Sequence, residues 1–489
     1  MCKPTVGALA IISAFTAVRI VLMLTLGFGI DEAYTLAHAR ELRWSYFDHP
    51  PLHLWMAYYA RLIFGSGPAV RIPFVLLFAG TGWLCFSLTR YLFGARAGLW
   101  ALFALNASAF FTLSPGGWVV PDGPLLFCLA AAAVMAARIL FPDHPSSAAG
   151  WWEWSLVGLW LGLAGLSKYS ALLFVLGLLI FILRSSEHRF WIWRAAPYVG
   201  AVITLSLLFP VLLWNYENRW VSFVFQGGRG LATGRFHFQY VLSIIVGQIA
   251  LLLPWIMLPL TTAMIQMGRC SRPESPVRFL VCLALPPIVV FTVIPLWGAR
   301  GLPHWPMPGW FFGFPLLGAW FSRIRRETII LRRWSIVSAG ALCGLLLVGV
   351  TMASSGWSRL IVPDGIKYED PTLESFNWTD LREARLLQPA GSRPPAFIIA
   401  RNWMDGGKID QALGGRIPVM IFSDDPRQFA FDRNSNDYLG QDGIIIVKSS
   451  HAAAEVQRLG SFFESFGKAE TLSLGRRGTD EISLTRVLG

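Results

Sequence analysis

Apolar residues in the first 356 positions come in blocks of about twenty, separated by short stretches that carry basic residues, Pro or Gly. A helix of about twenty residues crosses about 30 Å of hydrocarbon. The pattern predicts eleven membrane-spanning segments, near residues 5–29, 68–89, 97–113, 123–140, 154–166, 170–183, 196–214, 239–265, 277–297, 306–321 and 335–353. We therefore expect a polytopic α-helical membrane protein.

Residues 357–489 have a pattern typical of a soluble α/β domain. The predicted elements are, in order, a helix at about 372–388, β-rich runs at 396–400, 417–422 and 443–448, a helix at 451–466, and strands around Leu472 and Ile482 joined by a turn at 475–479. The run RNWMDGGKIDQALGG at 401–415 is either a ligand-binding loop or an ordinary connection between a strand and a helix. The sequence predicts two domains, a transmembrane domain at 1–356 with its first outer loop at 31–67, and a soluble domain at 357–489.

Composition and charge narrow the class of protein. Hydrophobic residues make up 54% of the 489 residues and charged residues 14%, against about 25% charged residues in ordinary soluble domains, so a soluble enzyme is excluded. The formal charge is +12, but the first 356 residues carry +14 and the remainder −2. Apart from Arg19, inside the first span, the basic residues of the first 356 positions divide into fifteen on one side of the membrane and nine on the other. By the positive-inside rule the N-terminus is cytoplasmic, and the odd number of spans then places the C-terminal domain outside the cytoplasm. The basic charge reflects topology rather than nucleic-acid binding.

Carboxylates are scarce in the membrane half, and three elements predicted on its outer side carry them. Asp31 and Glu32 follow the first span in FGIDEAYTLAHAR, Asp48 precedes two prolines in YFDHPPLHLW, and Asp122 lies in SPGGWVVPDGPLLF. The alternative for the first pair is an N-cap of a helix that begins at Ala33. The alternative for Asp48 is another helix cap beside an interfacial aromatic belt. Three such elements on one side favour a site, with Asp31, Glu32, Asp48 and Asp122 as its predicted catalytic carboxylates.

Cationic residues predicted on the same side complete the pattern. Lys168 lies between two short apolar runs in LAGLSKYSALL, Arg229 lies in the Gly-rich loop FQGGRGLATGRFHF, and Arg300 precedes GLPHWPMPGW. A cation at the centre of the bilayer costs roughly 2.5–3.5 kcal/mol unless it is paired or reaches water. Lys168 and Arg19, which lies inside the first span, therefore indicate a polar cavity. The alternative for both is snorkelling to the lipid headgroups.

Carboxylates, cations and aromatic side chains at the outer leaflet suit a substrate with an anionic phosphate, an apolar tail and a polar group to transfer. A lipid-phosphate-linked sugar has all three. One carboxylate would take the proton of an acceptor hydroxyl that attacks the anomeric carbon, while Lys168, Arg229 and Arg300 stabilise the departing phosphate. The membrane half has neither a P-loop nor a strand-linked GxGxxG motif, so no soluble nucleotide is predicted. The predicted substrate cavity contains Tyr34, Tyr169, Gln226, His304 and Trp305.

These motifs resemble the GT-C superfamily of polyprenyl-phosphate-sugar transferases. The resemblance is strongest to its bacterial branch of lipid A aminoarabinose and lipopolysaccharide-core galacturonic acid transferases, which is related to protein O-mannosyltransferases. It rests on DEAYTLAHAR, YFDHPPL, PDGPLLF, GLAGLSKYSALL, WNYENRWVSFVFQGGRG and LPHWPMP, in family order. It implies an inverting transferase with a periplasmic active site, and Asp31 as the catalytic carboxylate of the first loop.

The resemblance also implies contacts at the sugar donor. Asp48 matches an acidic residue that helps to hold a divalent metal ion in aminoarabinose transferases, and His49 takes the place of a Lys near the donor phosphate, where an imidazole is a weaker cation. The distal metal-binding His of that branch has no match, and this chain has Gln226, Arg229 and His237 in the corresponding neighbourhood. A divalent metal ion with Asp48 and His237 as ligands is left open, and no other cofactor is predicted.

The leading hypothesis is transfer of one sugar from an undecaprenyl-phosphate carrier to a lipid A, core or other envelope glycan acceptor at the periplasmic face of the bacterial inner membrane. Within the same class, the alternative acceptor is a Ser or Thr of a secreted protein. A lipid flippase or transporter is the alternative from another class, because intramembrane charges and Pro/Gly breaks also mark transport pathways. The predicted partners are the donor lipid, a lipid or glycan acceptor and membrane lipids, and no nucleic acid.

Overall fold

The computed structural model describes residues 3–142, 150–229, 235–324, 327–361, 371–387, 395–474 and 480–488. The chain divides into two compact units. The first comprises Met1–Val21, Arg43–His53 and Ile72–Gly344, and the second comprises Leu22–Leu42, Leu54–Arg71 and Leu345–Gly489. The sequence predicts a domain boundary after residue 356, whereas packing groups most of the first loop with the C-terminal part of the chain.

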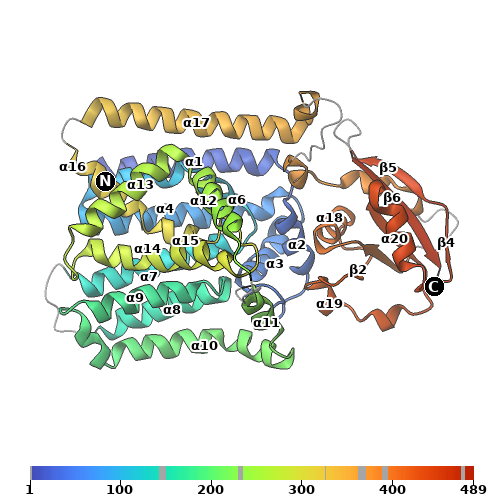
Figure 1. Cartoon of the computed structure of the whole chain (residues 1–489), viewed down its shortest axis with the longest axis horizontal. Coiled ribbons are helices and arrows are strands. Elements are labelled where there is room, and N and C mark those ends of the chain that lie inside the picture. The colour runs from blue at the N-terminus through green and yellow to red at the C-terminus, as the bar shows by residue number, and fades with distance from the viewer. Residues whose placement is uncertain are drawn as a thin grey trace. The chain divides into compact units, whose positions relative to one another are not determined.

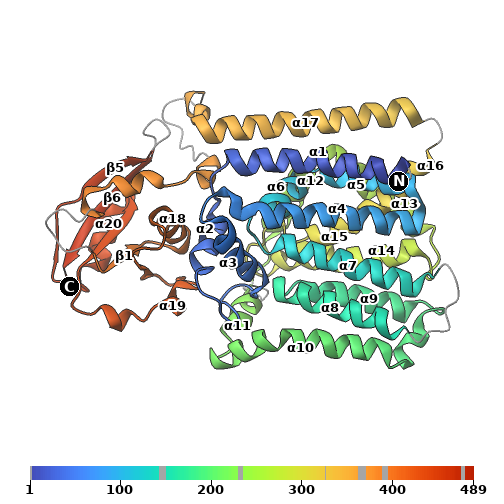
Figure 2. The same ribbon diagram turned by 180° about the vertical axis from the view of Figure 1, so that it is seen from behind.

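The first unit is a bundle in which α4, α7, α8 and α10 run along one another (Figures 1 and 2). Helices dominate because a backbone in hydrocarbon must satisfy its own hydrogen bonds. The helices that lie wholly or partly in this unit are α1 (Lys3–Thr25), α4 (Ile72–Phe93), α5 (Ala95–Asn106), α6 (Ala109–Gly117), α7 (Asp122–Leu140), α8 (Trp151–Ser167), α9 (Ala171–Arg184), α10 (Ala196–Glu217), α11 (Val221–Gly228), α12 (Phe238–Leu252), α13 (Pro254–Arg269), α14 (Pro276–Val293), α15 (Met307–Phe311), α16 (Phe314–Arg323) and α17 (Glu327–Ser355), with the short 3-10 helices η2 (Arg189–Trp193) and η3 (Ile294–Leu296).

Each of the eleven predicted spans coincides with a helix or a pair of helices, and the predicted fold class of a polytopic helical membrane protein is confirmed. By length and composition, six of the described helices could cross a membrane, or up to eight if two bent pairs each count as one span. The bent pairs are α5 with α6, at 79°, and α12 with α13, at 105°. Helices α8, with 17 residues, and α9, with 14, are shorter than a full crossing of about 20 residues.

Two local features shape the bundle. The chain turns between α12 and α13, where Leu253 has a left-handed backbone (φ 73°) and Pro254 has no N–H to continue the helix. Helices α8 and α10 approach closely at Gly158 and Gly200. A Cβ atom at Gly158 would lie only 2.1 Å from the Gly200 carbonyl oxygen, so a larger residue would not fit there. Small residues permit this kind of close helix contact in membranes.

The second unit contains a six-stranded mixed sheet in the order β2-β1-β3-β6-β4, with β5 paired to β6. Strand β1 is parallel to β2 and β3, whereas β6 is antiparallel to β3, β4 and β5. The strands are β1 (Phe397–Ala400), β2 (Val419–Ile421), β3 (Gly443–Lys448), β4 (Ser465–Phe466), β5 (Glu470–Leu474) and β6 (Asp480–Leu488), and the helices are α2 (Ile30–His38), α3 (Leu52–Phe64, from Leu54 onward), α18 (Trp403–Leu413), α19 (Phe429–Asp432) and α20 (Ala452–Leu459).

One core of the second unit joins the sheet to two helices. Ile398 and Ile446 from the strands cluster with Ile409 of α18 and with Tyr34 of α2. Helices α2 and α18 lie side by side in both ribbon views (Figures 1 and 2). A helix from the first loop is therefore part of the core of this unit.

The predicted strands of the C-terminal part are confirmed, and its predicted helices are corrected. One helix is predicted at 372–388, whereas the described residues of this stretch, up to 387, form three short 3-10 segments, Pro371–Ser375, Thr379–Glu383 and Arg385–Leu387. The helix predicted at 451–466 is limited to α20, and β4 follows it. The predicted turn at 475–479 lies outside the described residues.

The run at 401–415 is an ordinary strand-to-helix connection. Its helix, α18, begins after Asn402, whose side-chain oxygen accepts the Asp405 N–H at 2.9 Å. The helix ends at Gly414, which has a left-handed backbone (φ 71°). The structure thus supports the second of the two interpretations of this run.

Candidate active site

The first predicted carboxylates lie in the second unit, at the start of α2. Gly29 is the N-cap and the helix begins at Ile30, three residues before the predicted start at Ala33. The Gly29 N–H donates to the Glu32 carboxylate at 2.9 Å, so Glu32 and not Asp31 makes the capping contact. Asp31 is exposed in the first turn, where the partial positive charge of the helix end favours a carboxylate.

Glu32 forms a buried ion pair with Arg71. Its two carboxylate oxygens accept hydrogen bonds from Arg71, at 2.7 Å from Nε and 2.6 Å from Nη2. Both side chains are 1% exposed. A buried carboxylate held in this two-pronged pair cannot accept a proton from a substrate without breaking the pair, and loss of one partner leaves an uncompensated buried charge.

A second group of predicted residues converges in the first unit. Asp122 begins α7 and is 5% exposed, and Lys168 follows the last residue of α8. The Lys168 ammonium donates to both oxygens of Asp122, at 2.9 and 3.1 Å. Lys168 is therefore paired with a buried carboxylate and does not snorkel to the headgroups. Asp122 holds the cation in place, which is a positioning role compatible with phosphate binding by Lys168.

The segment that carries Asp48 is fixed by α11. Gln226 donates from its side-chain nitrogen to the Asp48 carbonyl oxygen at 2.6 Å, and the Ser222 hydroxyl donates to the Tyr46 carbonyl at 3.2 Å. The Ser222 N–H in turn donates to the side-chain oxygen of Asn215 at 3.1 Å. Asp48 itself is 4% exposed, and α3 starts at Leu52, directly after the two prolines.

Two histidines extend the charged cluster around Asp122 and Lys168. Burial lowers the pKa of His49 to about 4, against the opposing effect of nearby Asp48, with Lys168, Asp122 and Arg229 also acting on the ring. Burial likewise lowers the pKa of His304 to about 4, and the same Lys168 and Asp122 act on it. Both rings are therefore neutral at pH 7, so that His49 can offer a hydrogen bond to a phosphate but not a positive charge.

Arg229 is placed beside this group by aromatic side chains. Its guanidinium lies 4.3 Å from the ring centroid of Phe225 and 5.6 Å from that of Trp305, and it donates to the Gln226 side chain at 3.5 Å. Its carbonyl oxygen accepts the Ala299 N–H at 3.1 Å, which links the α11 end to the loop that carries His304 and Trp305. Arg229 and Lys168 are therefore cations that the described part of the first unit brings to this cluster.

Other predicted site residues differ in their surroundings. Arg300 is exposed. The Tyr169 ring packs on Phe223 at 5.2 Å between centroids, and the His237 ring stacks on Tyr240 at 4.7 Å. Tyr34 is 6% exposed in the core of the second unit, and its hydroxyl accepts the Gln428 N–H at 3.1 Å.

Arg19 is buried in the first unit and hydrogen-bonded. It is 2% exposed, donates to the side-chain oxygen of Asn106 at 2.7 Å, and lies 4.5 Å from the ring centroid of Phe78. These contacts offset the free-energy cost of burying the Arg19 guanidinium among apolar side chains. Neither a polar cavity nor snorkelling, the two interpretations from the sequence, is needed to explain Arg19.

Sequence reasoning missed several buried polar residues. His53 is 1% exposed, and its ring centroid lies 5.7 Å from that of His49. Asn215 is fully buried, and Arg71 is 1% exposed. The available signal was a polar residue within an apolar run, as in LHLW and LLWNYE, but that pattern does not name the partner.

The described side chains do not by themselves build a complete metal site. They contain no group of three or more His, Cys, Asp or Glu residues arranged to hold a metal ion. Protein sites for divalent metals usually supply at least three such ligands, unless substrate oxygens complete the shell. The metal with Asp48 and His237 as ligands therefore stays a prediction, and no reaction step is derived through it.

Comparisons with known proteins agree with this architecture. Residues 48–214 match the family model described as dolichyl-phosphate-mannose-protein mannosyltransferase. The crystal structure of ArnT from Cupriavidus metallidurans in the apo state shares the fold with a TM-score of 0.63 at 16% identity, over 97% of both chains. ArnT from the same organism bound to undecaprenyl phosphate gives a TM-score of 0.60 at 17% identity, again over 97% of both chains. No curated protein matches the chain.

The family model matches one part of the chain, residues 48–214, and the two ArnT structures share the fold of the whole chain. The family match and the shared fold agree with the resemblance seen in the sequence and with the predicted fold class. They also confirm a multi-pass membrane protein.

Proposed function

We propose that the protein transfers a single sugar, with inversion, from an undecaprenyl phosphate carrier to a lipid A, core or other envelope glycan acceptor. The reaction takes place at the periplasmic face of the inner membrane, with the N-terminus in the cytoplasm and the C-terminal domain in the periplasm. The observation that carries the proposal is the cluster of Lys168, Asp122 and Arg229 with two neutral histidines, built on long apolar helices. The complex of ArnT with undecaprenyl phosphate supports the choice of carrier.

The roles follow from the chemistry of the leaving group. A phosphate that departs from the anomeric carbon gains negative charge, and Lys168 and Arg229 stabilise that charge. Asp122 orients the Lys168 ammonium through two hydrogen bonds. His49 and His304 offer neutral donors or acceptors to phosphate or sugar oxygens.

Asp31 is the general base of the proposed reaction. It takes the proton of the acceptor hydroxyl while the hydroxyl oxygen bonds to the anomeric carbon, and the bond from that carbon to the phosphate oxygen breaks. Its support is an exposed carboxylate on a helix start that several contacts hold rigidly. The buried pair of Glu32 with Arg71 supports the choice of Asp31 over Glu32 as the base.

A second acceptor class is favoured by one observation. The family model that matches residues 48–214 is described as a protein mannosyltransferase. Transfer to a Ser or Thr hydroxyl of a secreted protein would use the same donor cluster and the same base. The two proposals differ only in the acceptor.

Mass spectrometry of the cell envelope tests the proposal and separates the two acceptors. Lipids, glycans and secreted proteins are compared between cells with the gene, cells without it, and cells complemented with the wild-type chain. We expect loss of one sugar mass from lipid A or core glycan on deletion, restored by complementation. Loss of a hexose mass from secreted proteins alone would favour the second acceptor, and unchanged glycans with a changed lipid distribution would support a flippase instead.

A further inference from the structure

The four residues before α2 are held by an unusually complete set of hydrogen bonds within the second unit. Arg71 donates to the carbonyls of Leu26 at 2.8 Å and Gly27 at 2.7 Å. The Phe28 N–H donates to the side-chain oxygen of Asn377 at 3.0 Å, and the Gly29 N–H to Glu32. Because this backbone is largely enclosed, each of these groups would be costly to leave without a partner.

The remaining carbonyl, that of Phe28, is bound by Lys408 of α18. The Lys408 ammonium donates to the carbonyl oxygens of Phe28, of Glu374 at 2.5 Å and of Phe376 at 3.0 Å. Lys408 is 4% exposed. An ammonium has three N–H donors, and all three are used on main-chain oxygens from two segments far apart in the sequence.

Helix α18 also fits tightly against α2 along its length. A Cβ atom at Gly407 would lie 2.7 Å from the Tyr34 nitrogen, so only glycine permits this approach. Beyond the other end of α2, Arg40 donates to the Asp410 carboxylate at 3.0 Å from Nε and 2.5 Å from Nη2. Lys408 and Asp410 therefore fix α2 near its beginning and near its end.

We propose that Lys408 is a positioning residue for catalysis, which binds the Phe28 carbonyl and thereby sets the orientation of the α2 start and of Asp31. The inference rests on the proposed function, since it takes Asp31 as the base. It assigns the C-terminal part of the chain a role in the chemical step: α18 holds the helix that carries the base. A displacement of the base by about 1 Å can lower a rate about 100-fold.

The charge state of Lys408 offers a readout that a purely structural residue would lack. Burial lowers the pKa of Lys408 to about 8, against the opposing effects of Glu32 and Glu374, and Arg71 lowers it further. Loss of the proton above that pH removes one N–H donor and the charge that strengthens the other two bonds. The hydrogen bond from Lys408 to the Phe28 carbonyl is therefore weaker in alkaline solution.

The experiment compares Lys408→Gln, Lys408→Arg and the control Lys448→Gln, which changes an exposed lysine at the end of β3, in the purified full-length protein. Sugar transfer is measured against pH with a defined polyprenyl-phosphate sugar. We expect Lys408→Gln to lower kcat about 10- to 100-fold with little change in donor KM. Wild type should lose activity above pH about 8, and Lys408→Arg should keep it to higher pH because a guanidinium stays protonated.

Hydrogen–deuterium exchange of residues 26–36 supplies a readout that does not depend on the reaction. We expect faster exchange there in Lys408→Gln than in wild type or Lys448→Gln. A folded Lys408→Gln protein with wild-type kcat and wild-type exchange would overturn the proposal. If the Gln variant does not fold, the comparison is between wild type and Lys408→Arg. The proposal would be overturned if both lost activity at the same alkaline pH.

The same data separate this inference from the proposed function. If Asp31→Asn keeps full activity while Lys408→Gln speeds hydrogen–deuterium exchange at 26–36, Asp31 is not the base. Lys408 then holds the backbone before α2 without a role in catalysis. If Asp31→Asn is inactive and Lys408→Gln is fully active, the base assignment stands and the positioning role is wrong.

Discussion

Each unit contains an ion pair between a carboxylate and a cation, and the two pairs differ in how much of the cation is used by the protein. In the second unit, the Glu32 and Arg71 side chains are each 1% exposed, and Arg71 also donates to three main-chain oxygens. In the first unit, the side chain of Asp122 is 6% exposed and that of Lys168 14%. The first pair is enclosed, and the second is accessible from the side of the cation.

Both pairs are buried, and both contain a residue that the sequence predicts in the site. A structural pair and a ligand-binding pair can be told apart by how many N–H donors of the cation are already used within the protein. The N–H groups of Arg71 donate to the Glu32 carboxylate and to the backbone before α2. Lys168 makes two bonds to Asp122, and an ammonium has three donors. A phosphate oxygen could take the third without breaking the pair.

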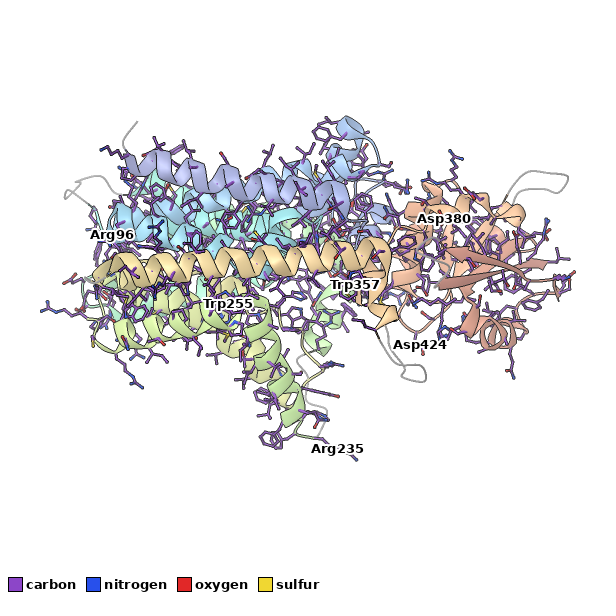
Figure 3. All side chains as sticks on the ribbon, turned by 90° about the horizontal axis from the view of Figure 1, so that it is seen from above. Arg96, Arg235, Trp255, Trp357, Asp380 and Asp424 are labelled. Carbon is purple, nitrogen blue, oxygen red and sulfur yellow. The ribbon has the colours of Figure 1, made fainter. Side chains whose placement is uncertain are left out.

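The largest effect is expected for Asp31→Asn. The amide keeps the shape of the side chain but cannot accept the proton, so kcat should fall by about 10²- to 10⁴-fold with folding unchanged. Product formation by the purified protein, followed by mass spectrometry, measures it. Asp424→Asn, at an exposed position of the second unit labelled in Figure 3, is the matched control and should remain fully active. Normal turnover by folded Asp31→Asn would exclude Asp31 as the base.

Glu32→Gln should act on stability rather than on chemistry. Removing one charge of the pair leaves Arg71 uncompensated in a buried site, which costs about 3–5 kcal/mol. Chemical unfolding in detergent, followed by intrinsic fluorescence, measures the change. The double variant Glu32→Gln/Arg71→Met should recover part of the loss, because it removes both charges. A single variant as stable as wild type would show that the pair is not structural.

The sequence predicted the parts of this molecule that depend on local pattern. Apolar blocks of sufficient length locate the helices, and the β-rich runs at 396–400 and 443–448 locate strands that the structure confirms. The motifs around Asp48, Asp122 and Lys168 are also local, and their residues meet in the first unit.

The remainder depends on partners distant in the sequence. Arg71 lies 39 residues from Glu32, and Gln428 lies 394 residues from Tyr34. Nothing in the pattern around Glu32 or Tyr34 indicates that such a partner will bury it, so both residues resemble site residues by sequence. Lys408 is missed for the same reason, because its bonds are to carbonyl oxygens, which carry no residue-type signal.

Lys168→Met tests the accessible pair and should have an intermediate effect. The substitution keeps most of the side-chain volume and removes one charged donor to the donor phosphate, which costs about 1.5–3 kcal/mol or roughly 10- to 150-fold in kcat/KM for the donor. Acceptor KM should change little. Arg300→Ala is the comparison, and because Arg300 is exposed its effect on kcat/KM for the donor should be smaller. Equal effects of the two variants, or none from Lys168→Met, would contradict the assignment of the phosphate to Lys168.

The smallest effect concerns the neutral ring of His304 and appears only in acid. Burial lowers the pKa of His304 to about 4, below its ordinary value of about 6.5. Between these two pH values the unfolded state binds more protons than the folded state, so the free energy of unfolding falls as pH decreases through that window. His304→Gln should remove this part of the slope and leave stability at pH 7 to 8 nearly unchanged. Unfolding measured from pH 7 to 4 in wild type and variant checks it, and identical slopes would mean that the ring is already solvated in the folded protein.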